Sequence, residues 1–229
     1  YKVNEHAIVV LRNVAVHAEV ELETAREGGL PPLVSLLRSP DERVQEQAIL
    51  VLRSLSVNQA NEVSIVSDTG LAPLMELLLA PQELIQTQAM SSVRTLTTGV
   101  DNQGKIVNEG GLPLIVGLLR SPNVEIQEHA AGAVRNLASN VNLKDKITQA
   151  DGLAPLIALT RSHSVAAQES ALAALLSLSF DSTVVNKLAE YGGIPPLVQL
   201  LGAPNDETQA LAAGICRNLS ISQETETEL

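Results

Sequence analysis

The chain has 229 residues, which is enough to bury a substantial core in one large domain or two ordinary ones. Hydrophobic residues make up 45% and aromatic residues only 1%, so the core must be built from aliphatic side chains. The single cysteine, Cys216, excludes an intrachain disulfide and a zinc site of several thiolates. The net charge of −11 argues against general affinity for nucleic acid or for an anionic membrane.

The sequence also carries no signal for membrane insertion or secretion. No uninterrupted apolar stretch approaches the ~20 residues that a membrane span needs, and the first residues lack a signal-peptide core. We therefore expect an intracellular chain, cytoplasmic or nuclear, with any peripheral membrane association left to segments outside this sequence.

The predicted elements repeat in one order from the N-terminus. The first is a helix over residues 3–17, which we interpret as the third helix of a partial repeat, 1–17. Complete repeats follow over about 18–58, 59–99, 100–140, 141–181 and 182–222, and an acidic tail covers 223–229. The whole of 1–229 is predicted to be a single domain.

Each repeat is predicted to contain a short helix, a second helix opened by Gly-Leu-Pro, a turn, and a longer third helix. Gly29 and its equivalents are expected to end the first helix with a positive φ, and proline is tolerated in the next first turn. Pro40 and Pro122 stop the second helix, and Asp41 or Asn123 then helps to start the third. Apolar residues at three- and four-residue spacing, as in 45–55, indicate helices rather than strands.

Several columns recur at a spacing of 41 residues. The motif Gly-Leu/Ile-Pro/Ala-Pro/Leu starts at Gly29, Gly70, Gly111, Gly152 and Gly193. Alanine recurs at Ala7, Ala48, Ala89, Ala130, Ala171 and Ala212. A single repeat cannot bury its apolar faces alone, so the repeats must stack.

The motifs Gly-Leu-Pro-Pro-Leu-Val-Ser-Leu-Leu and Ala-x-x-x-Leu-Arg-Asn-Leu resemble the armadillo repeat. The resemblance covers essentially the whole chain and implies an all-α fold, a right-handed α-solenoid of three-helix repeats. It also implies a non-catalytic scaffold for protein–protein interaction. The HEAT repeat is the nearest alternative, but it is usually a helix pair and needs no glycine break before every second helix.

No catalytic, cofactor or metal motif appears in the sequence. His6 and His129 share a column three repeats apart and cannot share a metal, so we interpret the histidines as surface residues. Cys216 lies in a column that is otherwise aliphatic, which favours a buried small hydrophobic side chain over a nucleophile. The glycine pairs repeat once per turn, which favours helix caps over phosphate loops. The chain is therefore predicted not to be an enzyme.

Two adjacent columns of the third helices stand out as a candidate binding surface. One column holds Arg12, Arg53, Arg94, Arg135, Leu176 and Arg217, and the next holds Asn13, Ser54, Thr95, Asn136, Ser177 and Asn218. A column eight residues before the second one is rich in glutamate, at Glu5, Glu46, Glu128 and Glu169. These offsets place the columns on one face of a helix.

In armadillo proteins this asparagine grips the backbone of an extended peptide in the concave groove. The resemblance implies that role for Asn13, Asn136 and Asn218, whereas the hydroxyl residues of the column lack the donor and acceptor pair of an amide. The tryptophan of importin-α-type repeats is absent. The arginines resemble those of β-catenin-like and fungal vacuolar armadillo scaffolds, which take acidic or amphipathic partner segments. We thus predict a groove of Asn13, Asn136, Asn218, Arg12, Arg53, Arg94, Arg135 and Arg217, with a partner protein and no nucleic acid as its ligand.

Three alternatives stay open at this point. The arginines could pair with the glutamate column across adjacent helices and be structural. The chain could self-associate, for example as a homodimer through the solenoid ends. It could also be the substrate-recognition part of a larger enzyme, such as a ubiquitin ligase.

Overall fold

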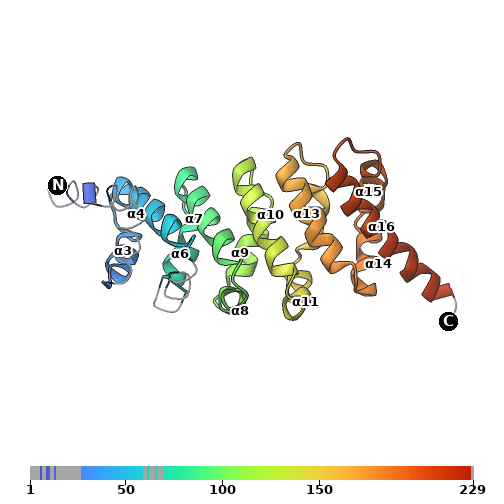
Figure 1. Ribbon diagram of the computed structural model, residues 1–229, viewed down its shortest axis with the longest axis horizontal. Helices are drawn as coiled ribbons and strands as arrows, with labels where there is room; N and C mark the ends of the chain where they lie inside the picture. The colour runs from blue at the N-terminus through green and yellow to red at the C-terminus, as the bar shows by residue number, and fades with distance from the viewer. Residues whose placement is uncertain are drawn as a thin grey trace. The chain divides into compact units, whose positions relative to one another are not determined.

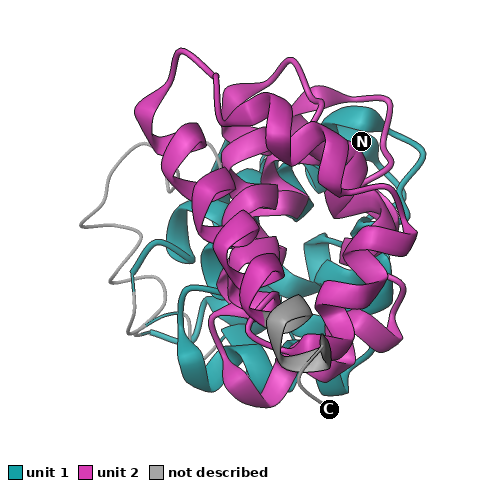
Figure 2. Cartoon of the chain, turned by 90° about the vertical axis from the view of Figure 1, so that its right-hand side faces the viewer, with its two compact units in different colours: residues 1–114 teal, residues 115–229 magenta. Residues whose placement is uncertain are grey.

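The computed structural model describes residues 6, 9, 10, 13, 27–58, 61, 65, 66 and 70–227, with side chains as far as 221. All regular secondary structure within these residues is helical (Figure 1). The chain divides into two compact units, residues 1–114 and 115–229 (Figure 2).

In the first unit, α3 and α6 are the second helices of their repeats, α4 and α7 are the third helices, and α8 is the first helix of the next repeat. Its helices are α3 (Leu30–Leu36), α4 (Glu42–Leu55), α6 (Leu71–Leu77), α7 (Glu83–Leu96) and α8 (Val100–Asn108). The third helices α4 and α7 pack side by side, and α3 and α6 each pack against the third helix that follows. Helix α9 (Gly111–Leu118) begins at the end of this unit.

The second unit begins with a third helix and then runs twice through a first, a second and a third helix. Its helices are α10 (Val124–Ala138), the 3₁₀ turn η1 (Val141–Leu143), α11 (Lys144–Gln149), α12 (Leu153–Leu159), α13 (Val165–Leu178), α14 (Ser182–Glu190), α15 (Ile194–Leu200) and α16 (Asp206–Thr227). The three third helices lie in a row, with α13 between α10 and α16 (Figure 1).

The predicted apolar columns of the third helices form the core. At most 1% of each of these side chains is exposed: Ala48, Leu52, Leu55, Ala89, Val93, Leu96, Ala130, Val134, Leu137, Ala171, Leu175 and Leu178. Phe180, the one phenylalanine of the sequence, is instead 74% exposed. The described core is aliphatic, as the composition predicts, and small side chains let the helices pack closely.

The prediction of a positive φ at Gly29 and its equivalents is wrong. The φ angles are −73° at Gly29, −73° at Gly70, −70° at Gly152 and −74° at Gly193. The residue before them has the left-handed conformation instead, at Gly28, Gly110, Gly192 and Asp151. Around Asp151 the N–H groups of residues 152 and 151 donate to the carbonyls of 147 and 148, which is a Schellman cap.

In the four repeats from Gly70 onward, the glycine just before or at the start of the second helix is required by close packing. A Cβ added at Gly70 would lie 2.6 Å from the carbonyl oxygen of Ile65, and one added at Gly193 would lie 2.8 Å from that of Leu188. Any side chain here would therefore push the first helix of the repeat away from the second.

In four of the described repeats, the turn between the second and third helices is held by a glutamine of the third helix. The side-chain amide of Gln45 donates to the carbonyl of Leu37 at 2.6 Å, and that of Gln168 donates to Thr160 at 2.8 Å. Gln86 makes the corresponding bond to Leu78, whereas Gln127 donates to Ser121, which lies in the turn after α9. These amides satisfy carbonyls at the end of a helix, where no intrahelical partner exists.

The third helices α4, α10 and α13 begin at side-chain caps, two of which the sequence predicts, whereas Gln82 before α7 makes no capping bond. Asp41 accepts a hydrogen bond from the backbone N–H of Arg43, and Asn123 accepts one from Ile126. Ser164 caps α13 in the same way, through the N–H of Ala167. A side-chain cap supplies one of the acceptors that the first turn of a helix lacks.

Cys216 is half-buried rather than fully buried. Its column is fully buried in α4, α7, α10 and α13, but α16 has a neighbouring third helix on one side only among the described residues. Partial burial raises the pKa of the Cys216 thiol, so the unreactive protonated form is favoured.

Candidate peptide-binding surface

The predicted arginine and asparagine columns lie near the C-terminal ends of the third helices. Arg53, Arg135 and Arg217 are exposed, and Arg94 is half-buried. The neighbouring residues Ser54, Thr95, Asn136, Ser177 and Asn218 are half-buried. Asn13 is an exposed helical residue, and Arg12 lies outside the described residues.

In the first unit, Arg53 is held by a neutral side chain of the next third helix. Its Nη1 donates to Oε1 of Gln88 at 2.7 Å, and Gln88 is buried. A neutral acceptor leaves the positive charge of Arg53 uncompensated. The sequence reasoning missed Gln88, because it considered only the glutamate column as the partner of the arginines.

The glutamate column does not neutralise the arginines of the second unit. Among the described residues, Arg135 and Arg217 form neither an ion pair nor a side-chain hydrogen bond, and Glu128 accepts the hydroxyl of Ser164 at 2.6 Å instead. The hypothesis that these two arginines are structural partners of glutamates is therefore wrong for this unit.

The position between these arginines is apolar. Leu176 of α13 reaches α16 at Gly214, where an added Cβ would lie 2.9 Å from Cδ1 of Leu176. The absent side chain at Gly214 thus makes room for Leu176. Across α10, α13 and α16 this column therefore presents a positive side chain, an apolar one and a positive one, namely Arg135, Leu176 and Arg217.

Two hydroxyls of the asparagine column donate within their own helices. Thr95 donates to the carbonyl of Ser91 at 3.1 Å, and Ser177 donates to that of Ala173 at 3.0 Å. A hydroxyl has a single hydrogen, so these two residues can only accept a hydrogen bond from a ligand.

Asn218 donates to a side chain of the preceding repeat. Its Nδ2 lies 2.8 Å from the hydroxyl oxygen of Ser179, the residue after α13. An amide carries two N–H groups and a carbonyl, so one donor and the acceptor of Asn218 remain for a ligand. This bond also fixes the orientation of the amide.

A hollow of about 350 Å³ lies beside Asn218. Its walls are formed by Ser179, Phe180, Ser182, Val185, Arg217, Asn218 and Ile221. Phe180 and Ile221 are 74% and 49% exposed, so the hollow offers apolar surface next to the Arg217 guanidinium. The sequence reasoning missed Phe180 and Ile221, because they follow the repeat columns without a distinctive motif.

The rim of this hollow is fixed by Lys144. Its ammonium group donates to the carbonyl of Ser177 at 2.6 Å and lies 5.5 Å from the centre of the Phe180 ring. Hydrogen bonds from Thr183, together with the charge of Lys144, lower the pKa of Asp181. Asp181 therefore stays ionised and caps α14 through the N–H of Thr183 at 2.8 Å.

The sequence pattern of the armadillo/β-catenin-like repeat matches residues 19–57, 99–139 and 186–221, which together are just over half of the chain. The chain belongs to the armadillo repeat family. No curated protein matches this armadillo chain.

Solved structures similar to this armadillo chain include engineered proteins. One designed armadillo repeat protein for modular peptide recognition has a TM-score of 0.87 and 25% identity, covering 93% of this chain and 92% of its own. A second, in complex with the peptide (KR)4, has a TM-score of 0.84 and 25% identity, covering 94% and 92%. A further engineered protein is 26% identical with a TM-score of 0.84, covering 96% and 90%.

Two further observations concern the described part of the chain. It contains no helix that is both long and apolar enough to cross a membrane. No three of its histidine, cysteine, aspartate or glutamate side chains come together as a group that could hold a metal ion.

Proposed function

We propose that this armadillo chain is a non-catalytic scaffold that holds an extended, acidic or amphipathic segment of a partner protein against its third helices. The family is generally one of binding scaffolds, and two of the similar designed proteins are described as peptide-recognition proteins or as a peptide complex. By analogy with these proteins, the chain binds a peptide, and its own side chains favour a peptide that is acidic or amphipathic.

The observation that carries the proposal is the pair of uncompensated arginines, Arg135 and Arg217. Both are exposed, and neither forms an ion pair within the described residues. An arginine presents a planar set of donors that fits a carboxylate or two backbone carbonyls. Carboxylates of a bound segment would supply the acceptors that the chain itself does not.

The apolar residues between and beside these arginines favour an amphipathic segment over a purely acidic one. Leu176 lies between the two arginine positions, and Phe180 and Ile221 border the hollow next to Arg217. An apolar side chain of the ligand would lose its contact with water there, which contributes roughly 25 cal/mol per Å² of apolar surface.

The arginines also have a structural effect, which any test must separate from binding. Arg53, Arg94 and Arg135 lie in the last turns of α4, α7 and α10, where a positive charge stabilises the helix dipole by about 0.3–1 kcal/mol. A variant that only destabilises the helix would lower the unfolding temperature without changing the affinity of the folded protein.

The test is the affinity of the chain for three labelled octapeptides, measured by fluorescence anisotropy. The peptides are (DELS)2, which is acidic and amphipathic, (DE)4, which is acidic, and the basic (KR)4. We expect (DELS)2 to bind most tightly and (KR)4 most weakly. Replacing Arg135 and Arg217 with Glu should weaken (DELS)2 binding about tenfold or more, because two attractive charges become repulsive.

The charge-matched control is the double variant Arg43→Glu, Lys105→Glu. Both residues are exposed and lie outside the arginine and asparagine columns, on α4 and α8. We expect this control to keep its affinity to within about threefold, since only the long-range field changes. Equal losses in the two double variants, or tighter binding of (KR)4 by the wild type, would refute the acidic-segment proposal.

Two further roles remain predictions from the sequence. A self-associating module should show a sedimentation coefficient that rises with protein concentration and is unaffected by the two arginine substitutions. A substrate-recognition part of a larger enzyme requires peptide binding by the same surface, and the sequence on either side of this chain would identify it.

A further inference from the structure

The turn after α3 forms an ion pair with the second helix of the next repeat. Arg38 donates from Nε to Oε2 of Glu76 at 2.9 Å and from Nη2 to Oε1 at 2.7 Å. This bidentate geometry matches the planar guanidinium to the carboxylate. The hydrogen bonds raise the pKa of Arg38 and lower that of Glu76, so both groups are charged.

Two arginines of the second unit occupy the same position of the repeat without that partner. Glu76 follows Arg38 by 38 residues, and the residue at the same separation from Arg120 is Ala158, and from Arg161 it is Gln199. Arg120 and Arg161 are exposed and form no hydrogen bond or ion pair through their side chains within the described residues. These two repeats therefore have the arginine that corresponds to Arg38 but no carboxylate at the position of Glu76.

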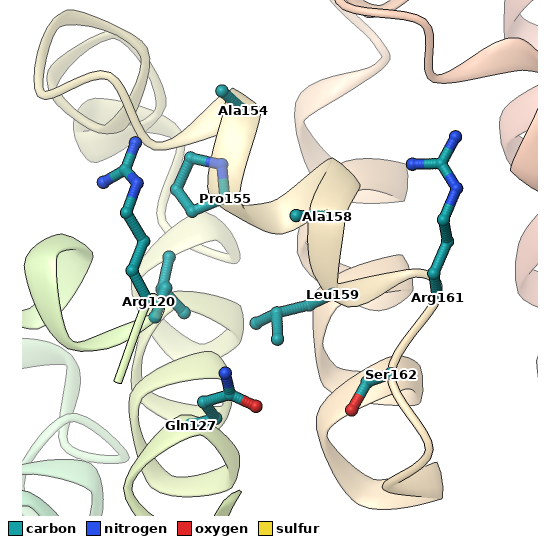
Figure 3. Close-up of a pocket in the computed structure, with 9 residues that line it drawn as sticks. Arg120, Gln127, Ala154, Pro155, Ala158, Leu159, Arg161 and Ser162 are labelled. Atoms are coloured by element: carbon teal, nitrogen blue, oxygen red, sulfur yellow. The ribbon is translucent and has the colours of Figure 1, made fainter. Parts of the chain in front are cut away.

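The missing partner leaves a hollow of about 460 Å³ between Arg120 and Arg161. Figure 3 shows the two arginines on either side of it, with Pro155, Ala158 and Leu159 between them. Pro155 and Leu159 are buried, and Ala158 is exposed at the position where Glu76 stands in the first unit. The floor is apolar, and both flanks are positively charged.

A second hollow, of about 300 Å³, adjoins the first at Arg120. It is lined by Lys187 and Tyr191, and also by Asp151, which is the acidic residue among its walls. Like the two arginines, Lys187 has no side-chain hydrogen bond or ion pair in the described structure. The two hollows together hold three cations and one carboxylate, on a chain whose net charge is −11.

We propose that the hollow between Arg120 and Arg161 is a second binding site, which takes an acidic segment of a partner protein. A carboxylate of that segment occupies the place of Glu76 opposite Arg120, and an apolar side chain lies on Pro155 and Leu159. The site is formed by the second helix α12 and the turns beside it. Gln127 of the third helix α10 also lines the hollow, but the site shares no residue with the arginine and asparagine columns.

The substitution Ala158→Glu tests this directly, because it supplies within the chain the carboxylate that Glu76 offers to Arg38. Ala158→Gln is the matched control, with the same size and no charge. A third variant, Arg120→Gln, removes the cation and leaves the hollow open. The side chains of residues 120 and 158 are both exposed, so the fold should tolerate all three changes.

The probe is the terminally blocked peptide Glu-Glu-Leu-Glu-Glu, titrated into the ¹⁵N-labelled full chain. We expect saturable shifts of the Ala154 and Ala158 amide signals. The affinity measured from these signals should fall about threefold to fivefold in Ala158→Glu and Arg120→Gln, and by less than about twofold in Ala158→Gln. The Arg135→Glu, Arg217→Glu variant should show the same shifts as the wild type, which separates this site from the third-helix surface.

Three results would overturn the proposal. The first is the absence of saturable shifts at Ala154 and Ala158. The second is an unchanged affinity in Ala158→Glu. The third is that inorganic phosphate at the same concentration saturates the same signals, because the hollow would then be a site for small anions rather than for a protein segment.

Discussion

The glycine pairs show how two adjacent residues of one type meet different physical demands. Gly110 has a φ of 81°, which an L side chain rarely adopts, whereas Gly111 is needed because the chain approaches closely. A Cβ at Gly111 would lie 2.8 Å from the carbonyl oxygen of Ile106 and 2.9 Å from Sδ of Met75. The sequence predicts the break between the helices but does not tell these two demands apart.

The substitution Gly111→Ala should therefore destabilise the protein. We expect a loss of about 1–3 kcal/mol in the free energy of unfolding, because the first and second helices of the repeat must separate to admit the methyl group. Chemical denaturation followed by circular dichroism measures this change.

Gly104→Ala is the matched control, in α8 of the same repeat. Nothing lies within 4 Å of a Cβ added there, so the change should stabilise the helix by about 0.5–1 kcal/mol. If Gly104→Ala were the more damaging of the two, the close approach at Gly111 would not be the reason for that glycine.

At the candidate site, residue types alone do not predict which hydrogen bonds the side chains form. The sequence identifies Thr95 and Ser177 as hydroxyls in the asparagine column, but not that each donates to the carbonyl four residues earlier. It also gives no sign that Asn218 is oriented by Ser179 of the preceding repeat. These bonds depend on side-chain rotamers and on the packing between repeats, which no single residue type determines.

At the scale of elements, the turn between second and third helices depends on one recurring side chain. Four glutamines of one column, Gln45, Gln86, Gln127 and Gln168, donate to carbonyls at the end of a second helix or in the turn that follows it. The recurrence of this glutamine at the repeat spacing was a signal in the sequence. Its role was not predicted, because a half-buried glutamine and a solvated one look alike in a helical pattern.

The substitution Gln168→Ala should cost about 1–2 kcal/mol in the free energy of unfolding, because it leaves the carbonyl of Thr160 without its 2.8 Å partner. Gln209→Ala is the control in the same column, since Gln209 is exposed and forms no side-chain hydrogen bond among the described residues. We expect it to change the stability by less than about 0.5 kcal/mol. Equal effects of the two substitutions on thermal and chemical unfolding would show that the bond contributes nothing.

The helices themselves were largely predictable. Proline and glycine positions locate the breaks, and the aliphatic columns identify the buried faces, which is why the core residues of α4, α7, α10 and α13 agree with the predictions. The exception in the core is Cys216, which is half-buried on α16, a helix that contacts one third helix, α13, among the described residues.

At the scale of the whole molecule, the net charge is −11, yet the second unit contains two separate groups of arginines that form no ion pair among the described residues. Arg135 and Arg217 belong to the third helices, and Arg120 and Arg161 to the turns that follow second helices. Composition predicts only the average field of the chain, whereas a local site is decided by which arginines lack a carboxylate partner. That distinction required the positions of Glu76, Glu128 and Ala158.

The central claim is that a peptide lies along the third helices, and the most direct measurement is the map of amide signals that shift when (DELS)2 saturates the ¹⁵N-labelled chain. The account predicts the largest changes along α10, α13 and α16, at Asn136, Ser177 and Asn218 and in the residues around Phe180. Saturation of the peptide signal with no shift in those three helices would contradict it.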